Sequence, residues 1–326
     1  MSFAAESGAG ILVSVIVVTW KVRDLLRECL ASLYAGFRLE PGHFEVVVVD
    51  NASGDGSAEM VRSEFPQARL IENVDNKGFG AANNQAFAHC TGKWILLLNP
   101  DTVVPPGAVE RMLAVATADS RIGAVGCRLL NGDGSLQKWT GGDFPNFRNM
   151  VSHYFFLDRL LPKPMRPAPL YLDRDVRENL RVGWVSGACM LLRRSVLGDH
   201  IFDSSYFMYG EDMELCHRLR RLGHEVVYTP AASIIHYQGA SMKQQKGDIL
   251  LSSLKGPRQF YMMSRGGGGA LLFDAITLLG FSLRWALYSL AGLAWRRADM
   301  RERAASSLQY VRIVLRLMRK DSQGGS

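Results

Sequence analysis

The stretch that decides the fold is residues 45–57, which reads EVVVVDNASGDGS. Its run of valines is typical of a strand buried on both faces, and the glycine-rich segment after Asp50 is typical of the turn that follows such a strand. Two similar apolar runs, residues 13–19 (VSVIVVT) and 94–98 (WILLL), are separated from it by segments with apolar residues at helical spacing. This alternation predicts an α/β protein with a parallel sheet covered by helices on both faces.

Polar residues follow these predicted strands. Asp50 and Asp101 both come at strand ends, and parallel sheets bind ligands at the carboxyl ends of their strands. A carboxylate at Asp50 can accept a hydrogen bond from a pyrimidine N–H, while Asn51 and Ser53 can bond a base or a ribose. An ordinary turn rich in Asn, Gly and Asp is the simpler explanation when residues 50–57 are taken alone.

Residues 99–101 (Asn-Pro-Asp) suggest a cation site after the third strand. Hard divalent cations take oxygen ligands, often one or two carboxylates with phosphates and waters completing the shell, and Asp101 is placed for this role. His236 can add a nitrogen ligand, because a neutral imidazole binds divalent metals. A β-turn at residues 99–101 and a purely structural histidine are the alternatives.

Residues 210–215 (GEDMEL) place Glu211 and Asp212 at the start of a predicted helix. A positioned carboxylate can take the proton of an attacking hydroxyl group, and a helix N-terminus favours the ionised, proton-accepting form. Acidic residues also occur in first turns for dipole reasons alone. The pattern leaves both interpretations open.

Composition narrows the class of protein. The chain has 326 residues, of which 48% are hydrophobic and 21% charged, as expected for a folded globular protein. Its five cysteines are scattered and form no C-x-x-C pair, which argues against a disulfide framework and a structural zinc site and predicts a reducing compartment. The sequence contains neither a G-x-x-x-x-G-K-[ST] phosphate loop nor a G-x-S-x-G elbow.

Residues 130–181 show little periodicity. They contain glycines at positions 132, 134, 141 and 142 and a cluster of prolines between positions 162 and 169. We therefore predict loops and short elements over the site, followed by a return to regular structure at residues 182–192 (VGWVSGACMLL).

The net charge of +7 is concentrated near the C-terminus. Residues 1–255 hold 27 Lys and Arg against 27 Asp and Glu, whereas residues 256–326 hold 11 against 4. The same region contains an apolar run, residues 270–295, in which Asp274 and Arg284 argue against a clean membrane-spanning helix. We predict an interfacial helix or helical hairpin on an anionic membrane surface, and no nucleic-acid partner. A soluble helical subdomain or an oligomer interface is the alternative.

Taken together, these motifs resemble family 2 glycosyltransferases of the GT-A fold, most closely bacterial rhamnosyltransferase-like members. The resemblance covers about residues 11–242 and rests on VSVIVVTW, EVVVVDNASGDGS, LIENVDNKGFGAANNQA, WILLLNPDT, VGWVSGACMLLRR, FMYGEDMELCHRLRRLG and the IIHYQGAS region. We therefore expect an N-terminal tail (1–10), a glycosyltransferase domain (11–245) with a nucleotide-sugar half (11–105) and an acceptor half (106–245), and a basic, apolar helical region (246–326).

The resemblance also implies roles for individual residues. Asp212 matches the catalytic base, with Glu211 beside it. Asp101 matches the last acid of the D-x-D motif and, with His236, would bind a divalent metal, Mg²⁺ or Mn²⁺. Asn99 replaces the first acid of that motif, as is usual in a subgroup of which several members use dTDP-rhamnose. The donor would be held by Thr19, Asp50, Asn51, Ser53, Asp55, Asn76, Gly78, Asn83, Asn99 and Asp101, and the acceptor by Trp184, Ser186 and Gly187.

The implied reaction is a single displacement that inverts the anomeric centre. The favoured donor is dTDP-rhamnose, and the acceptor is a glycan or a polyprenyl-diphosphate-linked glycan of cell-envelope polysaccharide synthesis. We expect a peripheral or monotopic enzyme on the cytoplasmic face of the inner membrane, alone or as an oligomer. One alternative is a nucleotidyltransferase, which would need glycines where the chain has Trp20-Lys21-Val22-Arg23. The other is a non-catalytic membrane-bound scaffold of the same fold.

Overall fold

The computed structural model describes residues 10–39, 42–173, 175–206, 210–237, 249–294 and 297–323. It divides into two compact units, which we call the sheet unit and the helical unit. The sheet unit comprises Met1–Gly142 and Tyr171–Gly247, and the helical unit comprises Asp143–Leu170 and Asp248–Ser326. The domain boundary expected at residue 245 lies outside the described residues.

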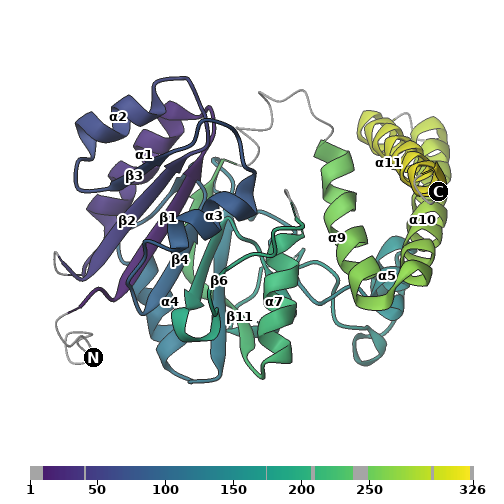
Figure 1. Ribbon diagram of the computed structural model, residues 1–326. Helices are drawn as coiled ribbons and strands as arrows, with labels where there is room; N and C mark the ends of the chain where they lie inside the picture. The colour runs from purple at the N-terminus through teal and green to yellow at the C-terminus, as the bar shows by residue number, and fades with distance from the viewer. Residues whose placement is uncertain are drawn as a thin grey trace. The chain divides into compact units, whose positions relative to one another are not determined.

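A mixed sheet forms the centre of the sheet unit (Figure 1). Its main strand order is β3-β2-β1-β4-β10-β6-β11-β5. Strands β1 to β4 are mutually parallel where they pair, as the apolar runs predict, and β10 runs antiparallel between β4 and β6. The predicted α/β class is therefore confirmed. The strands are β1 (Val13–Thr19), β2 (Phe44–Asp50), β3 (Arg69–Glu72), β4 (Trp94–Leu98), β5 (Thr102–Val103), β6 (Ile122–Leu130), β10 (Cys189–Arg193) and β11 (Glu225–His236).

Three short strands complete the sheet unit. β8 (Leu180–Val182) pairs with β11, and β7 (Gly141–Gly142) pairs with β9 (Trp184–Val185) in a separate two-stranded sheet. Helices connect the larger strands. They are α1 (Arg23–Gly36), α2 (Ser57–Glu64), α3 (Phe79–Phe87), α4 (Ala108–Thr117) and α7 (Glu211–Arg221).

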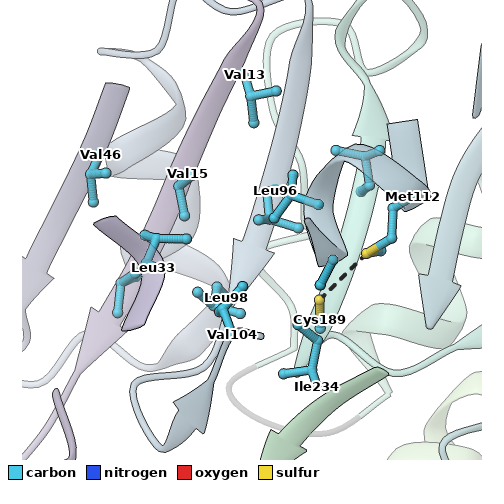
Figure 2. Close-up of a cluster of buried hydrophobic side chains, with 14 of the residues drawn as sticks. Val13, Val15, Leu33, Val46, Leu96, Leu98, Val104, Met112, Cys189 and Ile234 are labelled. Atoms are coloured by element: carbon cyan, nitrogen blue, oxygen red, sulfur yellow. Dashed lines mark hydrogen bonds between the residues drawn. The ribbon is translucent and has the colours of Figure 1, made fainter. Parts of the chain in front are cut away.

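Both faces of the central strands are buried. Val15 of β1 and Leu96 of β4 belong to one core with Leu33 of α1 and Met112 of α4 (Figure 2). Ile16, one position further along β1, lies on the opposite face and is also fully buried. This double burial explains why the strands read as unbroken apolar runs rather than as alternating patterns.

The helical unit is built around three long helices, α9 (Ile249–Arg265), α10 (Gly267–Ala294) and α11 (Ala298–Gln323). It also contains α5 (Phe147–Tyr154), α6 (Leu157–Leu160) and a short 3₁₀ helix, Lys163–Met165. Among the described residues, one helix is long and apolar enough to cross a membrane, Gly268–Ala294 with a mean hydropathy of 1.5. Length and composition alone make it a candidate span.

Helix α5 is one of the short elements predicted for residues 130–181. It belongs to the helical unit, where it packs on α10. A Cβ atom at Gly280 of α10 would lie 2.5 Å from the Cβ atom of Tyr154, so glycine permits the close approach of the two helices. The helix begins at a capping box formed by Asn146 and Asn149, which the usual Ser/Thr and Glu/Gln signature does not reveal.

A buried ion pair joins α9 to α10. Arg258 donates from Nε and Nη2 to the two carboxylate oxygens of Asp274 at 2.7 Å each, and Asp274 is 1% exposed. Removing one partner leaves an uncompensated buried charge, so we expect Asp274→Ala to lower the free energy of unfolding by about 3–5 kcal/mol. Urea denaturation followed by circular dichroism measures this.

Asp299→Ala is the matched control, because the pair that Asp299 forms with Arg297 is exposed and contributes little to stability. Equal effects of the two substitutions would contradict a stabilising role for the buried pair.

Candidate active site

Four neighbouring strands meet at one edge of the sheet. Thr19, the last residue of β1, pairs with Asp50, the last residue of β2, and Asn99 follows the end of β4. The Asn99 N–H donates to the Ala188 carbonyl, just before β10 begins, at 2.9 Å. Adjacent strands lie about 4.8 Å apart, so about 15 Å separates the end of β2 from the start of β10. One extended ligand can reach both.

Asp50 lies buried at one end of this edge. Its Oδ1 accepts a hydrogen bond from the Ser53 N–H at 3.0 Å, and burial raises its pKa above the ordinary value. The Ser53 hydroxyl accepts from the Lys21 N–H at 3.0 Å, which ties the turn after β2 to the loop after β1. The buried Thr19 Oγ1 has no hydrogen-bond partner among the described residues and is available to a ligand.

Asn51 holds a neighbouring loop. Its Nδ2 donates to Asn76 Oδ1 at 2.8 Å and to the Gly78 carbonyl at 3.2 Å. Its Oδ1 accepts from Asn73 Nδ2 at 3.0 Å and from the Lys77 N–H at 3.1 Å. These four bonds use both donors and both acceptor positions of the amide. Asn51 therefore fastens this loop to the end of β2, and its expected contact with a donor stays a prediction.

Asp55 and Asn83 are also engaged within the protein. Asp55 accepts from the N–H groups of Arg23 and Ser57, each at 3.1 Å, at the starts of α1 and α2. Asn83 is buried and donates to the Phe79 carbonyl within α3 at 2.8 Å. Their expected contact with a donor stays a prediction.

Asp101 and His236 form a close pair of candidate metal ligands. Asp101 Oδ1 lies 3.2 Å from His236 Nε2, and the two side chains are 6% and 8% exposed. Asn99 Nδ2 lies 3.2 Å from the same ring nitrogen. The pairing of His236 with Thr102, at the junction of β11 and β5, brings together residues that are far apart in the sequence.

The hydrogen bonds of Gln137 decide which ring nitrogen of His236 carries the proton. Gln137 Nε2 donates to Asn131 Oδ1 at 3.2 Å and to the His236 carbonyl at 3.4 Å. Its Oε1 therefore faces His236 Nδ1, at 2.8 Å. Because an amide oxygen only accepts, Nδ1 carries the hydrogen. When Nε2 carries no proton, its lone pair faces Asp101.

This geometry fits a divalent cation. A carboxylate oxygen and an imidazole nitrogen 3.2 Å apart can share a proton as an ion pair or, with that nitrogen unprotonated, can bind one cation together. Ligands about 2.1 Å from a metal, at adjacent corners of an octahedron, lie about 3.0 Å apart. The described residues contain no group of three His, Cys, Asp or Glu side chains that could hold a metal ion. The pair therefore suits a cation whose other ligands are phosphate oxygens and water.

Helix α7 begins with two carboxylates at the same edge. Gly210 precedes them with φ of +95°, a left-handed conformation that favours glycine. Asp212 accepts from the Met213 N–H at 2.8 Å and from the Gly187 N–H at 3.3 Å. The second bond joins the start of α7 to the segment that leads into β10. Gly187 precedes Ala188, whose carbonyl accepts from the Asn99 N–H, so Asp212 is held near the end of β4.

The two carboxyl groups titrate at different pH. Burial, and then the charge of Asp212, raises the pKa of Glu211 to about 8. Burial raises the pKa of Asp212 to about 6, against the opposing effect of its backbone hydrogen bonds. The pKa of Glu211 is raised more than that of Asp212, so Asp212 is the first of the two to ionise as pH rises. Asp212 is therefore the group able to accept a proton at neutral pH.

A cavity of about 680 Å³ lies at the other end of the strands. Trp94, the first residue of β4, and Arg193, the last residue of β10, help to line it. Arg193 donates to the Ile122 carbonyl at 2.9 Å and the Ala116 carbonyl at 3.0 Å, and its guanidinium stacks on Trp94 at 4.4 Å. Its role there is structural, and the candidate site residues lie at the opposite strand ends.

Comparison with known proteins identifies the family. The family model described as glycosyl transferase family 2 matches residues 14–201. The chain belongs to this family. It is therefore a glycosyltransferase with the GT-A fold, as the resemblance of its motifs predicts.

Its relatives include rhamnosyltransferases. The enzyme is 31% identical over 244 residues to N-acetylglucosaminyl-diphospho-decaprenol L-rhamnosyltransferase of Mycobacterium tuberculosis, covering 70% of this chain and 76% of the relative. It is 26% identical over 236 residues to rhamnosyltransferase WbbL of Escherichia coli K12, covering 69% and 83%. In fold it is similar to the mannosyltransferase PcManGT of Pyrobaculum calidifontis, solved with GDP-Man and Mn²⁺. The TM-score is 0.54 at 17% identity, covering 94% of this chain and 86% of the other.

The expected acceptor residues of this glycosyltransferase lead directly to Asp212. Trp184 of β9 is buried, and its Nε1 has no hydrogen-bond partner among the described residues. The Ser186 N–H donates to the Thr140 carbonyl at 2.9 Å. The next residue, Gly187, bonds Asp212 as described above. The path from β9 to β10 therefore carries the expected acceptor residues to the expected base.

Sequence reasoning missed two side chains that shape the site of this glycosyltransferase. Gln137 lies 99 positions from His236 in a segment without periodicity, so no local pattern marks it. Asn73 supports Asn51 through its side-chain amide. It stands within the polar run that follows β3, which offered a signal.

Proposed function

We propose that this glycosyltransferase moves L-rhamnose from dTDP-rhamnose to a hydroxyl of a lipid-linked glycan during cell-envelope polysaccharide synthesis, with inversion of the anomeric centre. The observation that carries the reaction is the presence, along one sheet edge, of the Asp212 carboxyl group held by the Gly187 N–H and of the close pair Asp101 and His236. The choice of rhamnose is supported by the two relatives named as rhamnosyltransferases. The lipid-linked acceptor is supported by the mycobacterial relative, which is named as a transferase to N-acetylglucosaminyl-diphospho-decaprenol.

Donor binding is assigned to the ends of β1, β2 and β4. Asp50 accepts a base N–H, and the unpartnered Thr19 hydroxyl bonds the same nucleoside. Asp101 and His236 would hold a divalent cation, which when bound neutralises the charge of the departing diphosphate. The Gln137 hydrogen bond keeps His236 in the tautomer that this requires.

The transfer step uses Asp212 as the base. The acceptor oxygen forms a bond to C1 of the sugar, and its proton passes to the Asp212 carboxylate. The bond between C1 and the diphosphate oxygen breaks, and the nucleoside diphosphate leaves with that electron pair. A single displacement from the face opposite the leaving group inverts C1. The Gly187 N–H keeps the carboxylate in place.

We expect kcat/KM to change with pH as Asp212 and Glu211 ionise. Asp212 must be ionised to accept a proton, so we expect kcat/KM to rise with pH up to about 6 and then level off. Ionisation of Glu211 near pH 8 adds a second negative charge beside the base, so we expect the rate to fall above that pH. Initial rates from pH 5 to 9 at saturating metal measure both limbs.

Glu211→Gln keeps a neutral group at that position, so it should remove the alkaline limb and leave the acid limb in place. An acid limb below pH 5 in the wild-type enzyme would contradict the assignment of Asp212.

A donor panel tests the proposed reaction. Thermal shifts with dTDP-rhamnose, UDP-N-acetylglucosamine and GDP-mannose, each with Mn²⁺ or Mg²⁺, rank the donors because a ligand that binds the native state raises Tm. We expect the largest shift from dTDP-rhamnose, and transfer to a short-chain polyprenyl-diphosphate-linked N-acetylglucosamine. The anomeric configuration of the product, read by NMR, checks inversion. A larger shift with another donor would replace rhamnose, and retention would reject a single displacement.

We also propose that the helical unit holds the enzyme on the cytoplasmic face of the inner membrane. This unit contains 16 Lys and Arg against 7 Asp and Glu, a net charge of +9, whereas the sheet unit contains 22 against 24, a net charge of −2. Basic segments beside a bilayer are attracted to anionic lipids. Flotation should therefore be stronger with phosphatidylglycerol vesicles than with phosphatidylcholine vesicles. Absence from both would reject membrane binding.

A further inference from the structure

The polar residues of α10 point into the helical unit. Asp274 forms the buried ion pair with Arg258, and the Thr277 hydroxyl donates to the Phe273 carbonyl at 2.8 Å. Arg284 donates from Nε to the Tyr154 carbonyl at 3.1 Å and from Nη2 to the His153 carbonyl, at the end of α5. These groups are satisfied by the unit itself. The charges that argue from sequence against a membrane helix therefore lie on the face that α10 turns away from its surroundings.

The opposite face of α10 is mostly apolar, with two partly buried serines, Ser282 and Ser289. Leu279, Leu290 and Leu293 are 62%, 66% and 74% exposed. Between positions 268 and 294, all of which the structure describes, every exposed residue is apolar or glycine. They are Gly268, Leu271, Leu272, Ala275, Leu279, Leu283, Trp285, Ala286, Leu287, Leu290, Leu293 and Ala294. A helix that faces water buries its apolar side chains and exposes its polar ones, and α10 shows the reverse pattern.

Helix α11, from the same unit, shows the ordinary pattern. Ile313, Val314 and Leu317 are buried. Its exposed residues are mostly polar and include Arg301, Arg303, Arg312, Arg316 and Arg319. The two helices pack on each other, so the exposed apolar side chains of α10 do not result from poor packing of the helical unit. We therefore expect something outside the helical unit, a lipid or a protein, to cover the exposed leucine face of α10.

The composition of this face favours lipid over a protein partner. A protein interface carries about one hydrogen bond per 100–200 Å² and a polar rim. The indole N–H of Trp285 is the one polar group among the exposed side chains described for α10, and hydrocarbon requires none. The net charge of +9 on the same unit complements anionic headgroups. A bilayer supplies both the apolar and the charged complement.

The pairing of α10 with α11 decides how α10 meets the bilayer. Three contacts run antiparallel along the two helices. Gly292 lies against Arg301, the Arg303 guanidinium lies 6.0 Å from the Tyr288 ring, and Phe281 stacks on Tyr310 at 4.3 Å. In this register, the exposed arginines at 312, 316 and 319 continue beside the first half of α10.

A spanning α10 would carry these arginines into the hydrocarbon. The helix has 28 residues and a length of about 42 Å, enough to cross the core of about 30 Å. Arginines lie beside it along this whole length, and charged side chains within a bilayer are strongly unfavourable. With α10 parallel to the surface, its outer face meets acyl chains while α11 stays among headgroups and water.

We propose that α10 lies in the plane of an anionic bilayer, with its exposed leucine face among the acyl chains and its opposite face on α9 and α11. The inference rests on the membrane association proposed above and specifies its form. It makes the protein monotopic through one face of a single helix. The inward polar residues of α10 hold that face in its orientation.

Depth measurements on the full-length protein test this arrangement. Spin labels at Leu271→Cys, Leu279→Cys and Leu290→Cys report the two ends and the middle of the face, and Gln309→Cys on α11 is the control. All five native cysteines are buried, so the introduced thiols are the ones that react. On vesicles of phosphatidylglycerol and phosphatidylcholine, we expect equal depths of about 5–10 Å below the phosphates for the three α10 labels, and a water-accessible label at position 309.

Two patterns would overturn the proposal. A middle label near the bilayer centre with shallow labels at both ends means that α10 spans. Three water-accessible labels on floated vesicles mean that the membrane is bound by charge alone, and failure to float rejects membrane association as well.

Vesicle binding by charge-matched variants provides the second test. Leu279→Glu and Ala305→Glu each add one negative charge at an exposed position, but on α10 and α11 respectively. We expect Leu279→Glu to reduce the vesicle-bound fraction at least tenfold and Ala305→Glu less than twofold. Equal effects would overturn the role of the leucine face.

Transfer to a water-soluble acceptor analogue should be unchanged in both variants. If transfer is absent even in the wild type while the depth pattern holds, the proposed reaction fails and the in-plane helix stands.

Discussion

The Asp212→Asn enzyme is expected to turn over about 10²–10⁴-fold more slowly than the wild type, while its donor Kd stays nearly unchanged. The amide preserves the shape of the side chain but cannot take the proton of the acceptor hydroxyl. Asp212 lies beside the expected acceptor residues and bonds the Gly187 N–H, away from Asp50 and the nucleoside end. Single-turnover rates and calorimetric titration of the donor separate the two quantities.

Glu211→Gln is the matched control for this experiment. The pKa of Glu211 is raised more than that of Asp212, and glutamine resembles its protonated form in size and neutrality. We therefore expect its rate at pH 7 to stay within about tenfold of the wild type. A wild-type rate for Asp212→Asn would show that Asp212 is not the base. If the wild-type protein itself binds donor and transfers nothing, the non-catalytic scaffold becomes the better hypothesis.

Loss of either member of the Asp101–His236 pair is the second large effect that we expect. Asp101→Ala or His236→Ala should lower kcat/KM by about 10²–10³-fold, equivalent to about 3–4 kcal/mol of transition-state stabilisation. Each substitution removes one of two adjacent ligand positions, and the described residues provide no third such side chain nearby. Mn²⁺ binding by electron paramagnetic resonance and activity at a fixed metal concentration measure the effect.

Two further variants locate the effect at the metal. Gln137→Ala removes the bond that sets the His236 tautomer, so we expect metal affinity to fall by about 10–100-fold and saturating Mn²⁺ to restore the rate. His200→Ala changes an exposed histidine whose partner is Asp199, and should change nothing. Full activity of the wild-type enzyme after treatment with a chelator would contradict a metal-dependent reaction.

Much of the fold was predictable because its signals are local. The runs 13–19 and 94–98 coincide with β1 and β4, since burial on both faces demands apolar side chains at every position. Helix α7 begins at Glu211 as predicted, after a glycine that takes a left-handed conformation. The bounds of helix α5 were not predicted, because its capping amides and its contact with Gly280 depend on residues that no short pattern joins.

The candidate site divides in the same way. The positions of Asp50 and Asp101 at strand ends could be predicted because the strand ends of a parallel sheet meet at one edge, and their roles stay predictions. The four hydrogen bonds of Asn51 could not be predicted, since they reach a loop beyond α2. Gln137 was missed because only the folded chain places it against His236.

The sequence by itself determined the family, the buried strands, the acidic residues at their ends and the basic, apolar C-terminal region, because periodicity and motif order are properties of neighbouring residues. Only the tertiary structure decided the His236 tautomer, the bond from Gly187 to Asp212 and the inward direction of Asp274 and Arg284 on α10. These depend on which distant segments pack together. Side-chain direction and hydrogen-bond partners follow from that packing, and a linear pattern does not contain it.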